Sequence, residues 1–118
     1  AILQDKKQKY YFTDKNEIMK FIEIKKYNDL PLVFSNKDSF NLFYQNLKKI
    51  NFPIYKVKSF YLFESNRWDL ITKKNQTVKL PNNNYLESLN NFLKLEINKN
   101  FEKYKIFDYR IKNQLILK

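Results

Sequence analysis

The chain of 118 residues contains no glycine, no cysteine and no histidine. Without cysteine it can form neither a disulfide bond nor a thiolate site. Without histidine it lacks the commonest catalytic base and the commonest zinc ligand. Without glycine its tight turns must use another residue, and asparagine tolerates the left-handed backbone region better than other non-glycine residues do.

Long apolar runs are also missing. No run approaches the roughly 20 residues that a membrane-spanning helix requires, and no signal peptide is visible. The chain does not begin with methionine, so we expect a fragment or a processed product of a longer protein. Hydrophobic residues make up 43% and aromatic residues 18%, which excludes a disordered chain. The length is typical of one domain, and we expect residues 1–118 to form a single domain.

The net charge of +11 favours nucleic acid or anionic lipid as a partner at first sight. However, lysine, asparagine, isoleucine, tyrosine and phenylalanine are all abundant, and all have codons rich in A and T. Such a bias raises the lysine content without selection for binding. Phosphate and base recognition favours arginine, and the chain has only two arginines. Solvated surface lysines are therefore the favoured interpretation, and a basic nucleic-acid-binding domain is the alternative.

Three segments place a Lys-Asn pair between apolar runs that favour β-structure. The three asparagines are Asn16, Asn75 and Asn113. Because asparagine is the turn residue available to this chain, each segment predicts a β-hairpin. The last hairpin would pair residues 105–111 with residues 114–118.

Two helices are predicted between these hairpins, over residues 37–50 and 85–97. Apolar residues recur in both at helical spacing: Phe40, Phe43, Tyr44, Leu47 and Ile50, then Leu86, Leu89, Phe92, Leu93 and Ile97. Capping pairs are expected at Ser35 with Asp38 and at Asn84 with Glu87. The apolar faces fit packing on a sheet better than a partner groove.

Residues 54–65 alternate as a strand that becomes central in its second half, with Val57, Ser59 and Tyr61 on one face. The element order is therefore hairpin, helix, strand, hairpin, helix, hairpin. It predicts an α+β fold with a largely antiparallel β-sheet built from three hairpins and a central strand, and with two helices packed on it.

Catalytic chemistry has little support in the sequence. The twelve carboxylates are scattered and do not form the cluster that a two-metal nuclease needs. No base is spaced to activate a tyrosine, lysine or serine nucleophile. We expect no catalytic residue, no metal and no cofactor; a hydrolase with an unrecognised site is a further hypothesis.

A series of short motifs runs through the chain: "YYFTDKNEIM", "YNDLPLVF", "RWDL", "TVKLP", a helix of about a dozen residues, and "IFDYRI". In order and spacing it resembles the C-terminal extracytoplasmic β domain of the FtsQ/DivIB division family. Asn16 and Asn75 stand where that family commonly has glycine, Asn66 replaces an arginine, and Tyr109 replaces a leucine. The family's cytoplasmic tail, membrane helix and POTRA module are absent from this chain.

The resemblance implies a non-enzymatic scaffold of the division complex that binds FtsB and FtsL. It implies a single-pass protein of the cell inner membrane, anchored by an upstream helix, with this domain on the periplasmic side. The family's contacts centre on the last strands. Carried over by position, the partner-binding residues are Arg67, Arg110, Ile111, Asn113, Gln114, Leu115, Ile116 and Leu117.

Trp68, the only tryptophan, is expected to be a structural anchor under the second helix. Strand alternation places Arg67 on the opposite face, where we expect an exposed, forked ion pair of little weight in stability.

Residues 114–118 contain three successive apolar residues and one charge, at Lys118. As the last strand of a final hairpin they would present free N–H and C=O groups, and exposed edges normally carry charge, proline or a cover. We therefore expect this edge to accept a partner strand, which Ile116→Pro would block if its N–H points outward. The alternative is an edge that ends the sheet or is covered by residues outside this chain.

Overall fold

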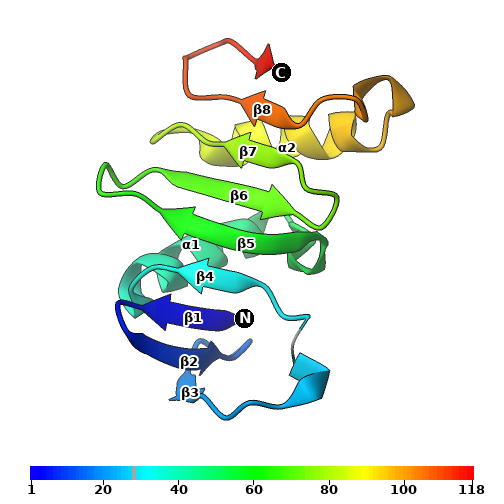
Figure 1. The fold of residues 1–118 in the computed structure, drawn as a ribbon. Coiled ribbons are helices and arrows are strands. Elements are labelled where there is room, and N and C mark those ends of the chain that lie inside the picture. Colours follow the sequence, from blue (N-terminus) through cyan, green and yellow to red (C-terminus); the bar gives the residue numbers. More distant parts are fainter. Residues whose placement is uncertain (28) are drawn as a thin grey trace.

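The computed structural model describes residues 1–27 and 29–118, and in these residues the chain forms one nine-stranded sheet with two α-helices (Figure 1). The strands are β1 (Ile2–Asp5), β2 (Gln8–Phe12), β3 (Ile18–Lys20), β4 (Leu32–Phe34), β5 (Val57–Leu62), β6 (Trp68–Thr72), β7 (Thr77–Lys79), β8 (Ile106–Asp108) and β9 (Ile116–Leu117). The α-helices are α1 (Lys37–Lys49) and α2 (Tyr85–Glu96), with short 3-10 turns η1 (Lys25–Tyr27), η2 (Ile54–Lys56) and η3 (Lys99–Phe101).

The sheet is mixed, with the strand order β3-β2-β1-β4-β5-β6-β7-β8-β9. The pairs β1–β4, β4–β5 and β7–β8 are parallel, and the other neighbours are antiparallel. Helix α1 joins β4 to β5, and α2 joins β7 to β8. A helical crossover returns the chain to the end where the first strand began, so the flanking strands run parallel. The predicted α+β class is confirmed, whereas the largely antiparallel sheet built from three hairpins is wrong.

Other residues, mostly asparagine, adopt positive φ angles at turn positions where glycine is usual. Asn16 and Asn75 have φ angles of 65° and 62° in the predicted hairpins β2–β3 and β6–β7, which are both present. Lys6 also has a positive φ angle, in the turn between β1 and β2, and so does Asn66, in the turn between β5 and β6. The sequence did not predict these two hairpins. The third predicted hairpin is not tight, because residues 109–115 separate β8 from β9.

Both helices begin at the predicted residues, but the capping contacts differ from the prediction. Asn36, rather than Ser35, caps α1: its side chain accepts a hydrogen bond of 2.8 Å from the Ser39 N–H. Asn84 precedes α2 with a left-handed backbone and makes no capping hydrogen bond with its side chain. Ile97 lies beyond the end of α2 and is 75% exposed, so it does not belong to the apolar face.

The core lies between the sheet and the helices. Residues paired in register form a row across the helix side of the sheet. Six successive members of this row are buried: Leu3, Val33, Phe60, Leu70, Val78 and Phe107. Phe40, Phe43 and Leu47 of α1 and Leu89 and Phe92 of α2 pack against this row. A shift in register between Val57 and Ser59 breaks the predicted alternation, because the extra residue lets Val57 join the core with Phe60.

Both helices cover the same face of the sheet, behind the strands in Figure 1. In the residues that the structure describes, neither α-helix lies on the opposite face, which we call the open face. Each strand alternates between the two faces, so Arg67 and Trp68 necessarily lie on different sides. The candidate site occupies the open face and the sheet edge at β9.

Candidate functional site

The C-terminal strand is shorter than predicted. Its two residues pair antiparallel with β8, and backbone hydrogen bonds join Lys118 to Lys105 and Ile106. The predicted pairing is therefore present at that end, and it is wrong for residues 109–111 and 114–115, which lie in the connection. Gln114 and Leu115 lie in the connection, where the Gln114 N–H donates to the Ile111 oxygen at 3.1 Å. Asn113 has a φ of 61°, so this connection turns at an asparagine as the tight hairpins do.

The register of β9 fixes which backbone groups face outward. The N–H groups of Ile106 and Lys118 each donate to the other residue's oxygen, at 3.3 and 3.2 Å. In an antiparallel ladder such bonded pairs alternate with non-bonded pairs. Leu117, opposite Phe107, therefore directs its N–H and C=O away from β8, and Ile116 directs its own groups inward. Since β9 ends the strand order, the groups of Leu117 face an open sheet edge.

Arg110 holds a forked ion pair with Asp108. Its Nε and Nη2 donate to the two carboxylate oxygens at 2.9 and 2.7 Å, and its backbone N–H donates to Oδ1 at 3.0 Å. The hydrogen bonds from Arg110 lower the pKa of the Asp108 carboxyl, and the same bonds raise the pKa of Arg110. The forked geometry predicted for Arg67 is thus present at Arg110.

Arg67 lies on the open face, as the strand alternation predicted. Its Nη1 donates to Asp69 Oδ1 and to the Leu80 oxygen, and its guanidinium lies 4.9 Å from the centre of the Phe63 ring. Its side chain is 17% exposed and that of Asp69 is 11% exposed. The expectation of an exposed ion pair is therefore wrong, because the guanidinium is covered by the ring and by the end of β7.

The two arginines belong to one charged row on the open face. Asp69 of β6 pairs in register with Lys79 of β7, which pairs with Asp108 of β8. Lys79 also contributes to lowering the pKa of Asp108. The row brings Arg67 and Arg110, 43 positions apart in the sequence, to the same side of three adjacent strands, with Asp69 and Asp108 buried beneath them.

Replacing Arg67 by alanine is expected to lower the free energy of unfolding by about 1–3 kcal/mol, because Asp69 would lose its charged partner in a largely buried position. Arg67→Lys, which keeps the charge but not the planar contact with Phe63, should lie between the alanine variant and the wild type. Urea denaturation of the three proteins measures the difference. An alanine variant with an unchanged midpoint would contradict the buried ion pair.

The Asp108 pair makes stability depend on pH in a defined direction. The folded-state pKa of Asp108 lies below its ordinary value of 3.8, so the pair stabilises the fold fully above that value. The stabilisation is lost as the pH falls through the lower folded-state pKa. We expect the Asp108→Asn variant to lose the part of the pH dependence of stability that this carboxyl contributes. Denaturation midpoints over a pH series measure it, and parallel curves for both proteins would exclude the effect.

Trp68 packs under α1 rather than under the second helix. Its ring stacks on Phe43 with centroids 4.3 Å apart and an interplanar angle of 9°, and Phe40 lies 6.2 Å away. Tyr85 of α2 reaches the same cluster through Phe43, at 5.3 Å. The predicted position under α2 is wrong. Strand alternation determines which face of the sheet carries the Trp68 ring, but which helix packs on that part of the face depends on how the helical connections cross the sheet.

A groove of about 600 Å³ lies beside the β9 edge, between residues 109–115, the segment before α2 and the first turns of that helix. Six of its lining residues carry side-chain amides: Asn82, Asn83, Asn84, Asn91, Asn113 and Gln114. The Tyr109 hydroxyl donates to Asn91 Oδ1 at 2.8 Å and joins the two walls. Burial raises the pKa of Tyr109, which stays neutral at physiological pH.

Sequence reasoning missed Lys79 and both aspartates as members of the site. A signal for the aspartates was present: Arg67 and Asp69 are two residues apart, as are Asp108 and Arg110. Residues two apart share a face of a strand, which favours an ion pair of Asp108 with Arg110, and the structure confirms that pair. The contact of Arg67 with Asp69 could have been predicted in the same way. No comparable signal links Lys79 to them, because that proximity depends on the pairing of β6, β7 and β8.

Two negative findings apply to residues 1–27 and 29–118. They contain no group of three histidine, cysteine, aspartate or glutamate residues placed to hold a metal ion. Neither α-helix in these residues is long and apolar enough to cross a membrane.

Comparison with known proteins gives one match. A family model described as "Cell division protein FtsQ/DivIB, C-terminal" matches residues 1–110. The matched residues include both arginines and Trp68, while residues 111–118, which contain β9, lie beyond them. A search of curated proteins found no match. The family is one of membrane-anchored, non-enzymatic division scaffolds whose C-terminal domain is extracytoplasmic, and a match to 110 of 118 residues shows that this chain belongs to the FtsQ/DivIB C-terminal domain family.

Proposed function

We propose that residues 1–118 form a single β domain that binds FtsB and FtsL on the periplasmic side of the cell inner membrane. An upstream membrane helix outside this chain anchors the protein in a single pass. The partner joins the sheet at β9, and the domain acts as a scaffold without catalysis. Membership of a family of division proteins supports the general role. The outward N–H and C=O of Leu117 carry the proposed binding mode.

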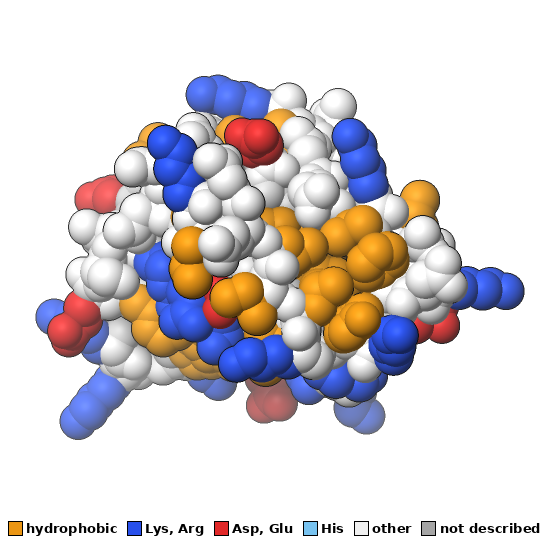
Figure 2. Space-filling view, turned by 90° about the horizontal axis from the view of Figure 1, so that it is seen from above, with side chains coloured by type: hydrophobic (Ala, Val, Ile, Leu, Met, Phe, Trp, Pro, Cys, Tyr) orange, Lys and Arg blue, Asp and Glu red, His pale blue; other side chains and the backbone are white. Residues whose placement is uncertain are grey.

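The side chains around this edge support strand addition. Leu115, Ile116 and Leu117 are all half-buried, so each retains apolar surface that a partner can cover. Ile111, in the connection before them, is 53% exposed. Figure 2 views the molecule from the end that carries β8 and the C-terminus, and hydrophobic side chains gather there with basic side chains beside them. Main-chain pairing supplies affinity in strand addition, and alternate side chains supply specificity.

The charged row supports an acidic partner. Arg110 is 45% exposed, although both Asp108 oxygens accept its hydrogen bonds. A guanidinium has five N–H donors, so Arg110 retains donors for a second carboxylate. In Figure 2 the basic side chains are distributed around the visible face rather than gathered in one patch, which favours a protein partner over nucleic acid.

The test is a titration of the isotopically labelled domain with the extracytoplasmic segment of FtsB, followed by hydrogen exchange. The Leu117 amide should gain protection on binding, because its outward N–H becomes bonded. The Ile116 amide, already directed toward β8, serves as the internal control and should change little. Failure to bind FtsB would contradict the function. Binding without protection of Leu117 would contradict the edge mechanism alone.

A further inference from the structure

The other end of the sheet carries a second open edge, formed by β3 and the segment after it. The Thr13 N–H donates to the Glu17 oxygen at 2.8 Å, which makes those residues a bonded pair at the turn between β2 and β3. Counting along the ladder, Met19 is bonded to Tyr11, and Ile18 and Lys20 direct their N–H and C=O groups outward. Since β3 is the first strand in the sheet order, these groups have no neighbouring strand among the described residues.

The apolar side chains of this edge are exposed. Met19 is 57% exposed and Ile22 is 63% exposed, and Ile18 and Ile24 are also exposed. An edge that is merely protected against pairing carries charge or proline and keeps large apolar side chains covered. Exposed apolar surface of this kind marks an interaction site.

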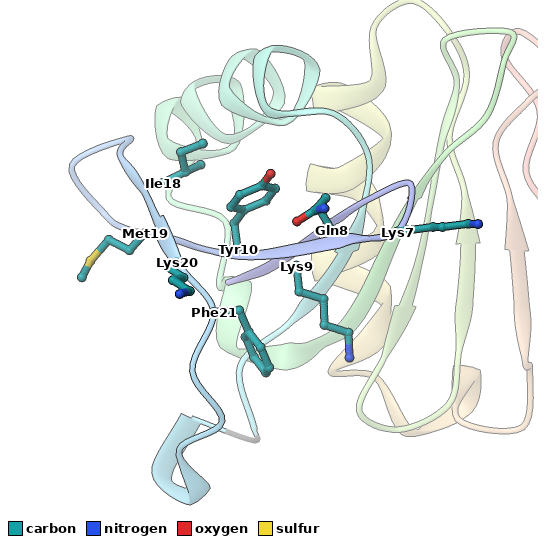
Figure 3. A pocket seen from close by; sticks show the side chains of 8 residues that line it. All are labelled: Lys7, Gln8, Lys9, Tyr10, Ile18, Met19, Lys20 and Phe21. Atoms are coloured by element: carbon teal, nitrogen blue, oxygen red, sulfur yellow. The ribbon is translucent and has the colours of Figure 1, made fainter.

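A notch of about 510 Å³ lies at this edge, where β2 extends beyond the end of β3. In Figure 3, Lys9 and Phe21 point to one side of the hairpin, and Gln8, Tyr10 and Ile18 point to the other. The Lys9 ammonium lies 5.5 Å from the Phe21 ring centre, and the Phe21 ring lies 5.2 Å from that of Tyr11. The Tyr11 hydroxyl donates to the Ile22 oxygen. These contacts hold the segment after β3 in place before any partner arrives.

The charges of the notch define its partner. Lys7, Lys9 and Lys20 line it, and none of the residues that line it is acidic. Two copies of this edge would bring like charges together, so self-pairing is opposed. Lys20 pairs with Tyr10, so it lies on the other face of the hairpin from Lys9 and Met19. An alternating strand would therefore place its carboxylates on the face of Lys20 and its apolar side chains on the face of Met19.

We propose that the β3 edge binds, by strand addition, an extended segment that alternates acidic and apolar side chains. The surface is distinct from the β9 edge, and the proposal does not depend on FtsB or FtsL binding there. Main-chain bonds to Ile18 and Lys20 supply the pairing, and the lysines select the partner's charge.

A synthetic peptide that alternates valine and glutamate is the probe, and a peptide that alternates valine and lysine is its counterpart. Both are titrated against the labelled domain by NMR, with hydrogen exchange as a second measurement. We expect the acidic peptide to shift and protect the amides of Ile18 and Lys20, and to leave the Met19 amide, already bonded to Tyr11, little changed. The basic peptide should shift neither.

The double variant Lys9→Glu with Lys20→Glu should weaken binding of the acidic peptide about tenfold and enable binding of the basic one. The matched control, Lys37→Glu with Lys94→Glu, makes the same change in net charge on the two helices and should bind as the wild type does. Three results would overturn the proposal: unshifted Ile18 and Lys20 amides, equal weakening in both double variants, or protection confined to β9.

Discussion

Replacing Trp68 by alanine is expected to lower the free energy of unfolding by about 3–5 kcal/mol. The ring is only 7% exposed and stacks on Phe43, so its removal leaves a cavity between the sheet and α1. The loss extends to α2, since Tyr85 packs on Phe43 and its hydroxyl accepts a hydrogen bond of 2.6 Å from Asn46 of α1. A change of this size is a large fraction of the stability of a small domain.

Urea denaturation, followed by circular dichroism, measures this loss. Trp68→Phe is the matched control, because a smaller ring keeps part of the stacking and should cost less than the alanine variant. A loss below about 1 kcal/mol for alanine would show that Trp68 does not anchor α1 to the sheet.

Replacing Leu117 by proline is expected to weaken binding of the FtsB segment roughly a hundredfold. Proline deletes the outward donor and leaves the corresponding acceptor of the partner unpaired in the interface. The variant should keep its fold, because the deleted N–H makes no bond to β8. Ile116→Pro is unsuitable for this purpose, since the Ile116 N–H points inward and its loss would damage the sheet itself.

Leu117→Ala controls for the side chain, which packs partly on the core. It removes the same apolar contact and retains the N–H, so its affinity should remain well above that of the proline variant. Isothermal titration calorimetry measures both, and circular dichroism checks the fold. Equal affinities for the two variants would exclude main-chain pairing at Leu117, although they would leave the family assignment unaffected.

The elements that local pattern determines were predictable from the sequence. The spacing of Phe40, Phe43 and Leu47 placed α1 to within one residue of its observed bounds. The asparagine turns at Asn16 and Asn75 followed from the absence of glycine. The strands β1 and β4 were missed, because short strands that depend on parallel neighbours carry no alternation of their own.

The site was predictable only in part, because its geometry depends on strand pairing. Alternation placed Arg67 opposite Trp68, but it could not show that Asp69, Lys79 and Asp108 would lie in one row across β6, β7 and β8. The burial of Arg67 depends on Phe63 and Leu80, which the fold brings to it. The N–H and C=O of Leu117 point outward because Lys118 and Ile106 form a hydrogen-bonded pair. No local sequence pattern specifies that register.

The width of the sheet determines what an open edge at each end can do. Eight spacings between neighbouring strands, about 4.8 Å each, account for most of the 41 Å long dimension of the molecule. A chain paired to β3 and a chain paired to β9 would therefore be too far apart to touch, and neither would exclude the other. With both edges occupied, the domain becomes a rigid spacer that holds two different segments at a fixed separation. Competition between the two segments, measured by titrating one in the presence of the other, would contradict this arrangement.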